Sequence, residues 1–327
     1  MSNLKTSLCL GLLAVLLSAC NPTTGYQQGG GMPVVETTIS ADGEMIAALD
    51  RPPPHRAPRL RIKRLLPQEG TWQEVPISPH ISSIRFGLSG KQLLLTEVID
   101  ETLRVVLVSW DMERLDAPPT LLYTGYRLVF PIEFKPGHYL VRSCNNKRES
   151  WPCTDRVFNS QWEWVHDKRP VQVFDRKSFP EPLLYGQPTV VGERGFFWFT
   201  NFKERRFITL SFKGQQLDTP EIPFDDTTTN IKCDQSLQRC MRSIQQGLTP
   251  ERKFIYAFSV FNAGQSCDVP ELAGFGDVFS ITPDGRAAVT AWADSAQLAR
   301  RVVVMRFKPG QCAPVSVEQY PFEEARS

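Results

Sequence analysis

The chain has 327 residues and a nearly balanced charge of +2 at pH 7, from 37 basic and 35 acidic residues. A balance of this kind creates no strong positive field, so the composition argues against a nucleic-acid partner. The length is sufficient for one large domain or two ordinary ones.

The first predicted element is a secretory signal. Lys5 is the only charge before Cys20, and residues 8–17 are almost wholly apolar. This run is shorter than the roughly 20 residues that span a bilayer, and small residues follow it, as at a processing site. The motif Leu-Ser-Ala-Cys, which ends at Cys20, resembles the lipobox of bacterial lipoproteins at all four positions.

The lipobox resemblance implies that residues 1–19 are removed and that Cys20 is acylated. Residues 20–32 are polar and glycine-rich, which predicts a flexible tether between lipid and domain. Asn21 is not Asp, and in the enterobacterial sorting pattern this resembles, that choice favours the outer membrane. We therefore predict a lipid-anchored outer-membrane protein on the periplasmic side, with display at the cell surface as the alternative.

Beyond the tether, short alternating apolar runs between Gly, Pro and Asp turns predict β-strands and no long helix. Hairpin turns recur at Gly43, Gly90 and Gly137, with 47 residues between neighbours, and again at Gly285. A second series of turn residues has a spacing of 50 or 51: Asp116, Asp167, Asp218 and Asp268.

A repeat of this length holds four strands, which is typical of a β-propeller. We predict an all-β, six-bladed β-propeller with four-stranded antiparallel blades over residues 33–322, followed by a tail at 323–327. A seven-bladed propeller or a β-sandwich pair is the alternative. The Ser-x-Asp-Gly and Thr-Pro-Asp-Gly turns resemble those of TolB-type and WD40-like propeller repeats. The predicted blade limits are 33–78, 79–125, 126–180, 181–226, 227–274 and 275–322.

Six cysteines remain after the signal and the lipidated position. An even number in an exported chain predicts disulfides, and proximity in the sequence favours two short pairs that leave one long pair. A metal site is disfavoured, because no two of these cysteines have CxxC spacing. The predicted pairs are Cys144–Cys153, Cys233–Cys240 and Cys267–Cys312.

The sequence contains no motif for metal hydrolysis, for a serine nucleophile elbow or for phosphate binding. Asp225 and Asp226 are weak candidates for a Ca²⁺ site, and a solvated acidic loop is the preferred interpretation. We predict no cofactor and no catalytic residue. An enzyme whose site assembles from several blades around the channel is left open.

Two connections favour partner binding. In a four-stranded blade the second-to-third-strand connections leave on one face, and here they include a proline-stiffened basic loop at 51–58 and an insertion from Cys144 to about Gln161. The alternative is an ordinary solvated strand and loop. The hypothetical partner-binding residues are Arg51, His55, Arg56, Lys147, Arg148 and Arg156.

These features together predict a protein-binding scaffold in an envelope assembly or secretion complex. The predicted partners are other envelope proteins, and the predicted membrane contact is the lipid. The alternatives are a propeller enzyme acting on periplasmic carbohydrate or small molecules through the central channel, and a surface adhesin. The oligomeric state is left open.

Overall fold

The computed structural model describes residues 35–50, 58–88, 90–98, 104–115, 117–126, 129–144, 153–161, 163, 189–191, 195–200, 206–211, 216–217, 227–250, 254–262, 264–273, 279–293 and 299–321. All of them belong to one compact unit, Gly31–Ser327. The predicted signal at 1–19 and the tether up to residue 32 lie outside the described residues.

The described residues are all β apart from one short 3-10 helix at Pro270–Leu272, as predicted. Their strands form five antiparallel sheets of four and one of three, each built from one contiguous stretch of chain. The first three sheets are β1 (Val35–Ile39), β2 (Met45–Asp50), β3 (Arg59–Arg64) and β4 (Gln73–Val75); β5 (Ile81–Phe86), β6 (Gln92–Val98), β7 (Arg104–Asp111) and β8 (Thr120–Tyr126); and β9 (Val129–Lys135), β10 (His138–Cys144) and β11 (Cys153–Phe158). The last three are β12 (Thr189–Val191), β13 (Gly195–Thr200), β14 (Arg206–Ser211) and β15 (Gln216–Leu217); β16 (Thr228–Cys233), β17 (Arg239–Leu248), β18 (Phe254–Asn262) and β19 (Gln265–Asp268); and β20 (Phe279–Ile281), β21 (Ala287–Ala293), β22 (Ala299–Arg306) and β23 (Ser316–Pro321).

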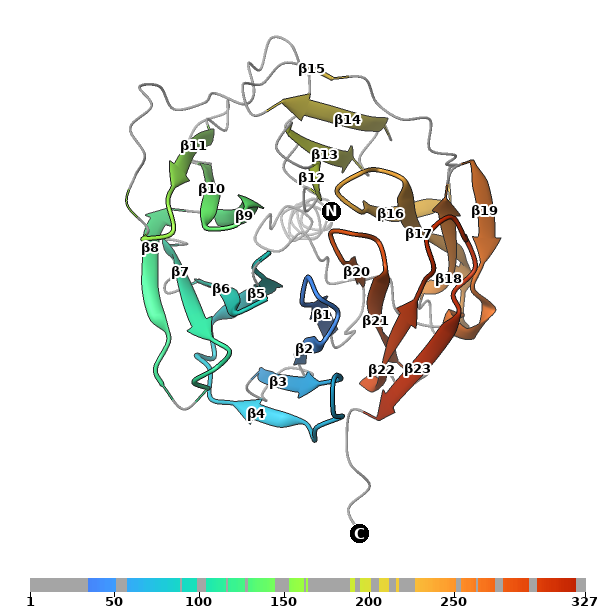
Figure 1. Cartoon of the computed structure of the whole chain (residues 1–327), viewed down its shortest axis with the longest axis horizontal. Helices are drawn as coiled ribbons and strands as arrows, with labels where there is room; N and C mark the ends of the chain where they lie inside the picture. The colour runs from blue at the N-terminus through green and yellow to red at the C-terminus, as the bar shows by residue number, and fades with distance from the viewer. Residues whose placement is uncertain are drawn as a thin grey trace, which may run out of the picture. The chain divides into compact units, whose positions relative to one another are not determined.

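The six sheets follow one another around a central axis (Figure 1), with the first strand of each nearest the axis and the last outermost. Each sheet contacts the next one along the chain, and β1 contacts β20 and β21, so the last sheet meets the first. The third sheet has three described strands rather than four.

Core residues lie between neighbouring sheets rather than on one face of a sheet. All six residues of β2 are buried. The side chains of Met45, Ala47 and Leu49 pack against the second sheet, and those of Ile46 and Ala48 pack against the sixth. A strand covered on both faces reads as a continuous apolar run, as Met45–Leu49 does.

The predicted Asp-Gly hairpins close the first two strands of the first and sixth sheets. In the β1–β2 turn, Asp42 Oδ1 accepts the Glu44 amide at 2.9 Å, and Gly43 has a φ of +73°. In the β20–β21 turn, Asp284 Oδ1 accepts the Thr282 hydroxyl at 2.7 Å and the Arg286 amide at 2.9 Å. These aspartates therefore fix turn geometry.

Contacts between neighbouring turns show that the first hairpins of five sheets share one face. Asp42 lies beside Gly90, Gly43 lies beside Ala287, Glu133 accepts the Leu88 amide, and the Arg239 guanidinium donates to the Gly285 carbonyl. We call this face, formed by the β1–β2, β5–β6, β9–β10, β16–β17 and β20–β21 turns, the turn face. The strands then run away from it, so the connections after β2 and β10 begin at the opposite face.

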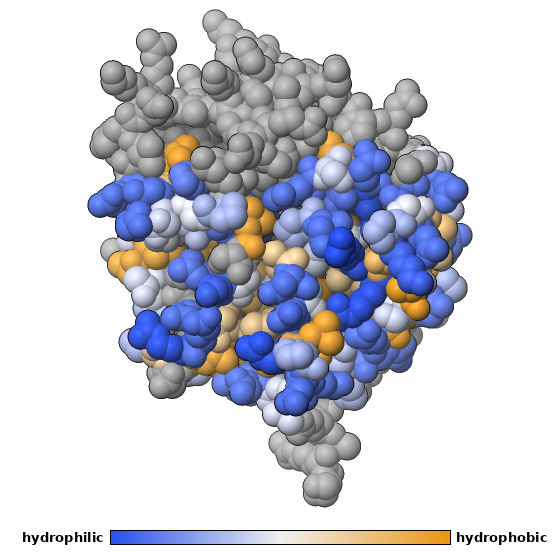
Figure 2. Space-filling model, in the orientation of Figure 1, coloured by the Kyte–Doolittle hydropathy of each residue, from blue (hydrophilic) through white to orange (hydrophobic). Residues whose placement is uncertain are grey.

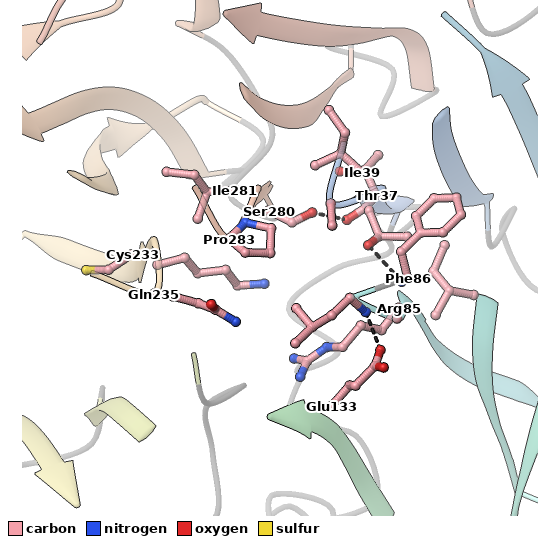
Figure 3. A pocket seen from close by; sticks show the side chains of 16 residues that line it. Thr37, Ile39, Arg85, Phe86, Glu133, Cys233, Gln235, Ser280, Ile281 and Pro283 are labelled. Carbon is pink, nitrogen blue, oxygen red and sulfur yellow. Dashed lines mark hydrogen bonds between the residues drawn. The ribbon is translucent and has the colours of Figure 1, made fainter. Parts of the chain in front are cut away.

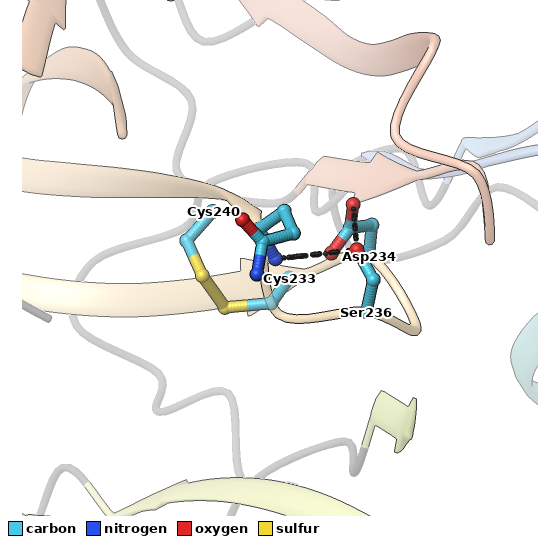
Figure 4. The surroundings of a disulfide bond; sticks show 5 residues. Cys233, Asp234, Ser236 and Cys240 are labelled. Atoms are coloured by element: carbon cyan, nitrogen blue, oxygen red, sulfur yellow. Dashed lines mark hydrogen bonds between the residues drawn. A yellow bond between two sulfur atoms is a disulfide. The ribbon is translucent and has the colours of Figure 1, made fainter. Parts of the chain in front are cut away.

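Two of the predicted disulfides are present in the described residues. Cys233–Cys240 bridges β16 and β17 and lies next to Asp234 and Ser236 (Figure 4). Cys267–Cys312 links β19 of the fifth sheet to the β22–β23 connection of the sixth. The third predicted pair, Cys144–Cys153, lies directly opposite in the β10–β11 ladder, but its side chains are outside the described residues.

The fifth and sixth sheets make a joint, which we call the stapled joint, that is centred on Arg239. This arginine is 4% exposed, and its Nη2 donates to the carbonyls of Lys308 at 2.9 Å and Gln311 at 2.6 Å. Its guanidinium also lies 4.7 Å from the Phe307 ring centre. With its bond to the Gly285 carbonyl, Arg239 of the fifth sheet therefore contacts both the β20–β21 turn and the β22–β23 connection of the sixth.

The sixth and first sheets meet at a second joint, which we call the closing seam. Ser280 Oγ donates to the Thr37 carbonyl at 2.9 Å, and Trp72 Nε1 donates to the Pro321 carbonyl at 2.8 Å. Lys63 lies 5.1 Å from the Tyr320 ring centre. Apolar side chains from both sheets fill the space between: Ile39, Ile46, Ala48, Leu65, Ala287, Val289, Ala291, Val302, Val304 and Tyr320.

Among the residues that the structure describes, no helix has the length and apolar character needed to cross a bilayer.

Candidate binding site

A cavity of about 120 Å³ lies at the turn-face end of the axis (Figure 3). Its described lining comes from the first strands β1, β5, β9, β16 and β20 and from the turns that follow them. Five sheets thus contribute to one space, which no single sheet could form.

Charged side chains from three sheets line this cavity. They are Arg85 from β5, Glu133 from β9 and Lys232 from β16, and the Gln235 amide joins them from the β16–β17 turn. Arg85 and Gln235 reach into the same space from different sides in Figure 3. The described lining therefore carries two cations and one carboxylate.

Glu133 has a structural role as well. It is 5% exposed, and its carboxylate accepts the Gly137 amide at 2.8 Å and the Leu88 amide, so it links the β5–β6 and β9–β10 turns. A Cβ at Gly87 would come within 2.6 Å of Glu133 Oε2, so a side chain there would displace the Glu133 carboxylate. Burial, followed by the nearby Glu133 charge, raises the pKa of Tyr139 above its ordinary value.

Two side chains of β1 hold the neighbouring strand β5. Glu36 Oε1 accepts the Ile84 amide at 3.3 Å, and Thr38 Oγ1 accepts the Phe86 amide at 3.3 Å. Thr37 differs, because it lines the cavity, is 3% exposed and has an Oγ1 without a hydrogen-bond partner. A buried hydroxyl left in this state costs about 1–3 kcal/mol, which a bound acceptor would recover.

The arrangement of the strands is similar to that of solved structures. TolB from Acinetobacter baumannii is 14% identical to this chain, with a TM-score of 0.54, over 87% of this chain and 65% of that one. The chain folds as a β-propeller. The matched region spans about 65% of the TolB chain. At 14% identity, the similarity concerns the fold alone.

Two further propellers are similar with TM-scores below 0.5. The propeller domain of the Trilobed protease from Pyrococcus furiosus is 11% identical, over 88% of this chain and 80% of that one, with a TM-score of 0.46. The WD40 propeller domain of Doa1 is 13% identical, over 90% and 86%, with a TM-score of 0.43. No protein-family model matches this propeller, and a search of curated proteins finds no match.

The described residues that line the channel cavity include none of the sequence-predicted lipid, partner-binding or metal positions. Arg156 belongs to β11, where its backbone pairs with Val141, and its side chain is outside the described residues. The other predicted positions lie wholly outside the described residues: Cys20, Arg51, His55, Arg56, Lys147, Arg148, Asp225 and Asp226.

The cavity residues were missed by the sequence analysis, although a positional signal exists. Arg85 and Lys232 each occupy the fifth position of a six-residue first strand, just before a hairpin turn. Both side chains line the cavity at the end of the channel. Among the described residues, no group of three or more His, Cys, Asp or Glu side chains could hold a metal ion.

Proposed function

We propose that this chain is a lipoprotein, anchored in the outer membrane and facing the periplasm, whose six-bladed propeller is a binding scaffold for envelope proteins. The observation that carries the proposal is the polarity of β1 and β2. Val35, where β1 begins, pairs with Asp50, where β2 ends, so both lie at the opposite face. The predicted tether and the loop at 51–57 therefore start from the same side of the propeller.

The second basic connection starts from this side too. It joins Cys144 to Cys153, and strand polarity puts both of these residues at the opposite face. The two segments, 51–57 and 145–152, contain four Arg or Lys residues and one acidic residue, Glu149. A lipid at Cys20 would keep this basic side within reach of the membrane, where an acidic surface of an envelope protein is the expected partner.

Two observations support six blades and a polar mode of recognition. The described residues form six sheets, and residues 164–188 provide the length for a fourth strand in the third. Hydrophilic residues prevail on the face seen in Figure 2, where hydrophobic residues form small scattered groups. Charge and hydrogen bonding are therefore the expected basis of specificity on such a surface.

The proposal is tested by crosslinking the tagged full chain in envelope membranes and identifying its partners. We expect one or two stoichiometric envelope proteins in the wild type, labelling of the chain with palmitate, and loss of both in Cys20→Ala. The double variant Arg51→Glu/Arg56→Glu should retain the lipid and lose the partner.

The matched control is Arg286→Glu, which reverses a charge on the turn face, where the side chain of Arg286 is 70% exposed. It should retain both lipid and partner. Recovery of the wild-type chain alone would contradict the scaffold role, and a partner that survives the reversal at 51 and 56 would contradict docking through the basic side.

A further inference from the structure

We infer that the cavity at the turn-face end of the channel is a binding site for a small oxyanion, a carboxylate or a phosphate group. The site is independent of the partner surface proposed above, because that surface belongs to the opposite face. It would give the propeller a small-molecule ligand in addition to a protein partner.

The donors of the cavity fit an oxyanion. Arg85 and Lys232 supply the guanidinium and ammonium groups, and Gln235 supplies a neutral amide. A guanidinium offers two parallel N–H groups that match the two oxygens of a carboxylate or phosphate. These groups come from the second and fifth blades, so an anion between them would contact both sides of the channel.

The carboxylate of Glu133 does not cancel this preference. It accepts amide hydrogens from Gly137 at 2.8 Å and from Leu88, and its single negative charge offsets only one of the two positive charges. Among the described lining residues the balance stays at two cations to one anion. The described part of the lining therefore carries a net positive charge, which favours an anion.

Thr37 supplies an independent observation that points to a ligand. Its side chain is at the channel, it is 3% exposed, and its Oγ1 has no hydrogen-bond partner. Buried polar atoms in folded proteins are nearly always bonded. An oxyanion in the cavity would accept the hydrogen of this hydroxyl and remove the deficit.

The size of the cavity restricts the ligand. About 120 Å³ is available, against roughly 300–1,000 Å³ in pockets that enclose drug-sized molecules. A single anionic group fits, either as a free ion or as the end of a narrow molecule. The cavity is too small to enclose an extended ligand.

The test is calorimetric titration of the full chain with inorganic phosphate and, separately, with succinate. We expect at least one of them to bind, more weakly as ionic strength rises. The probe that binds identifies whether phosphate or carboxylate is preferred. Arg85→Met and Lys232→Met should each weaken that binding by about tenfold or more.

Two further variants separate ligand contact from damage to the fold. Thr37→Val removes a hydroxyl that makes no hydrogen bond in the protein, so thermal stability should be retained while binding weakens severalfold. Arg286→Met, a charge loss on the turn face outside the cavity, should bind like the wild type. Failure of the wild type to bind either probe at millimolar concentration would overturn the inference. Binding that is unchanged in Arg85→Met, Lys232→Met and Thr37→Val would do the same.

Discussion

The stapled joint and the closing seam solve the same packing problem in different ways. At the stapled joint the chain is continuous, and a disulfide and a buried arginine are added to it. At the closing seam the first and last sheets share no strand, and the described contacts are apolar packing, hydrogen bonds and a cation over a ring.

This difference shows where the ring is covalently constrained. Cys267–Cys312 makes the fifth and sixth sheets one cross-linked unit, whereas the seam depends on side chains that meet only after the whole chain has folded. Opening of the ring should therefore begin at the closing seam rather than at the stapled joint.

The largest expected effect is loss of the long disulfide. The double variant Cys267→Ser/Cys312→Ser should lower the free energy of unfolding by about 4 kcal/mol, because the bond closes a long loop in the unfolded chain. The matched variant Cys233→Ser/Cys240→Ser removes a bond that closes a much shorter loop, so it should lower the free energy of unfolding by about 2.5 kcal/mol. Denaturant unfolding measures both, and equal losses would contradict the ranking.

A core truncation at the seam comes next. Ile46 is fully buried between the first and sixth sheets, so Ile46→Ala should cost about 3 kcal/mol in the free energy of unfolding. Hydrogen exchange should also accelerate in β1 and β23 before β18. Leu66→Ala is the control, because Leu66 is 42% exposed and its loss should cost less than about 1 kcal/mol. Uniform acceleration across all sheets would mean that the seam is not the weak joint.

Glycine substitutions distinguish the two joints by the space beside each turn. Gly285→Ala combines a φ of +69° with a Cβ 2.8 Å from Asp234 Oδ2, so a cost of about 2–3 kcal/mol in unfolding free energy is expected. At the seam, Gly43→Ala has a similar φ of +73°, but its nearest neighbour is the flexible end of Arg306 at 3.4 Å. That variant should cost about 1–2 kcal/mol, the backbone contribution alone. A larger loss at Gly43 than at Gly285 would refute the tighter packing of the stapled joint.

The two joints should also respond to pH with opposite sign. Burial raises the pKa of Asp234 in the stapled joint, more than its bonds to Ser236 and Arg239 lower it. At the seam, burial also opposes ionisation of Glu318, but bonds from Tyr320 and Ser316, with the Arg306 charge, bring its pKa below the ordinary value.

The signs follow from linkage. A depressed pKa makes Glu318 stabilising above the unfolded value of about 4.3, and this contribution is lost as the pH falls through the folded pKa. A raised pKa makes the Asp234 contribution greatest below the unfolded value of about 3.9, and it is lost as the pH rises through the folded pKa. The free energy of unfolding of Glu318→Gln should approach that of the wild type as the pH falls. The free energy of unfolding of Asp234→Asn should increase relative to that of the wild type as the pH rises. Parallel profiles would remove the contrast.

Local chemistry was sufficient to predict the turns and the short disulfide Cys233–Cys240, whereas the long pair Cys267–Cys312 was predicted only as the two cysteines left over. Gly43, Gly90, Gly137 and Gly285 all have positive φ, as hairpin turns built on Asp-Gly or similar pairs require. Cys233 and Cys240 are opposite each other because a hairpin joins their strands. Both features depend on residues that are close in the sequence.

The cavity and the stapled joint could not be predicted in this way. Arg239 reads as one more exposed charge in a short hairpin, yet it is 4% exposed because three carbonyls of the next sheet accept its hydrogens. Arg85 and Lys232 belong to the second and fifth sheets, and they share one cavity only because the ring closes. Contacts of this kind depend on the curvature of the whole ring, which no local pattern specifies.

The lack of a shared strand at the closing seam makes the order of the sheets cyclic. Five residues carry the chain from β4, which ends at Val75, to β5, which begins at Ile81. A linker of similar length from residue 321 to residue 35 would make the same kind of connection. A circularly permuted chain that starts at Ile81 and ends at Val75 would thus contain every strand ladder of the original.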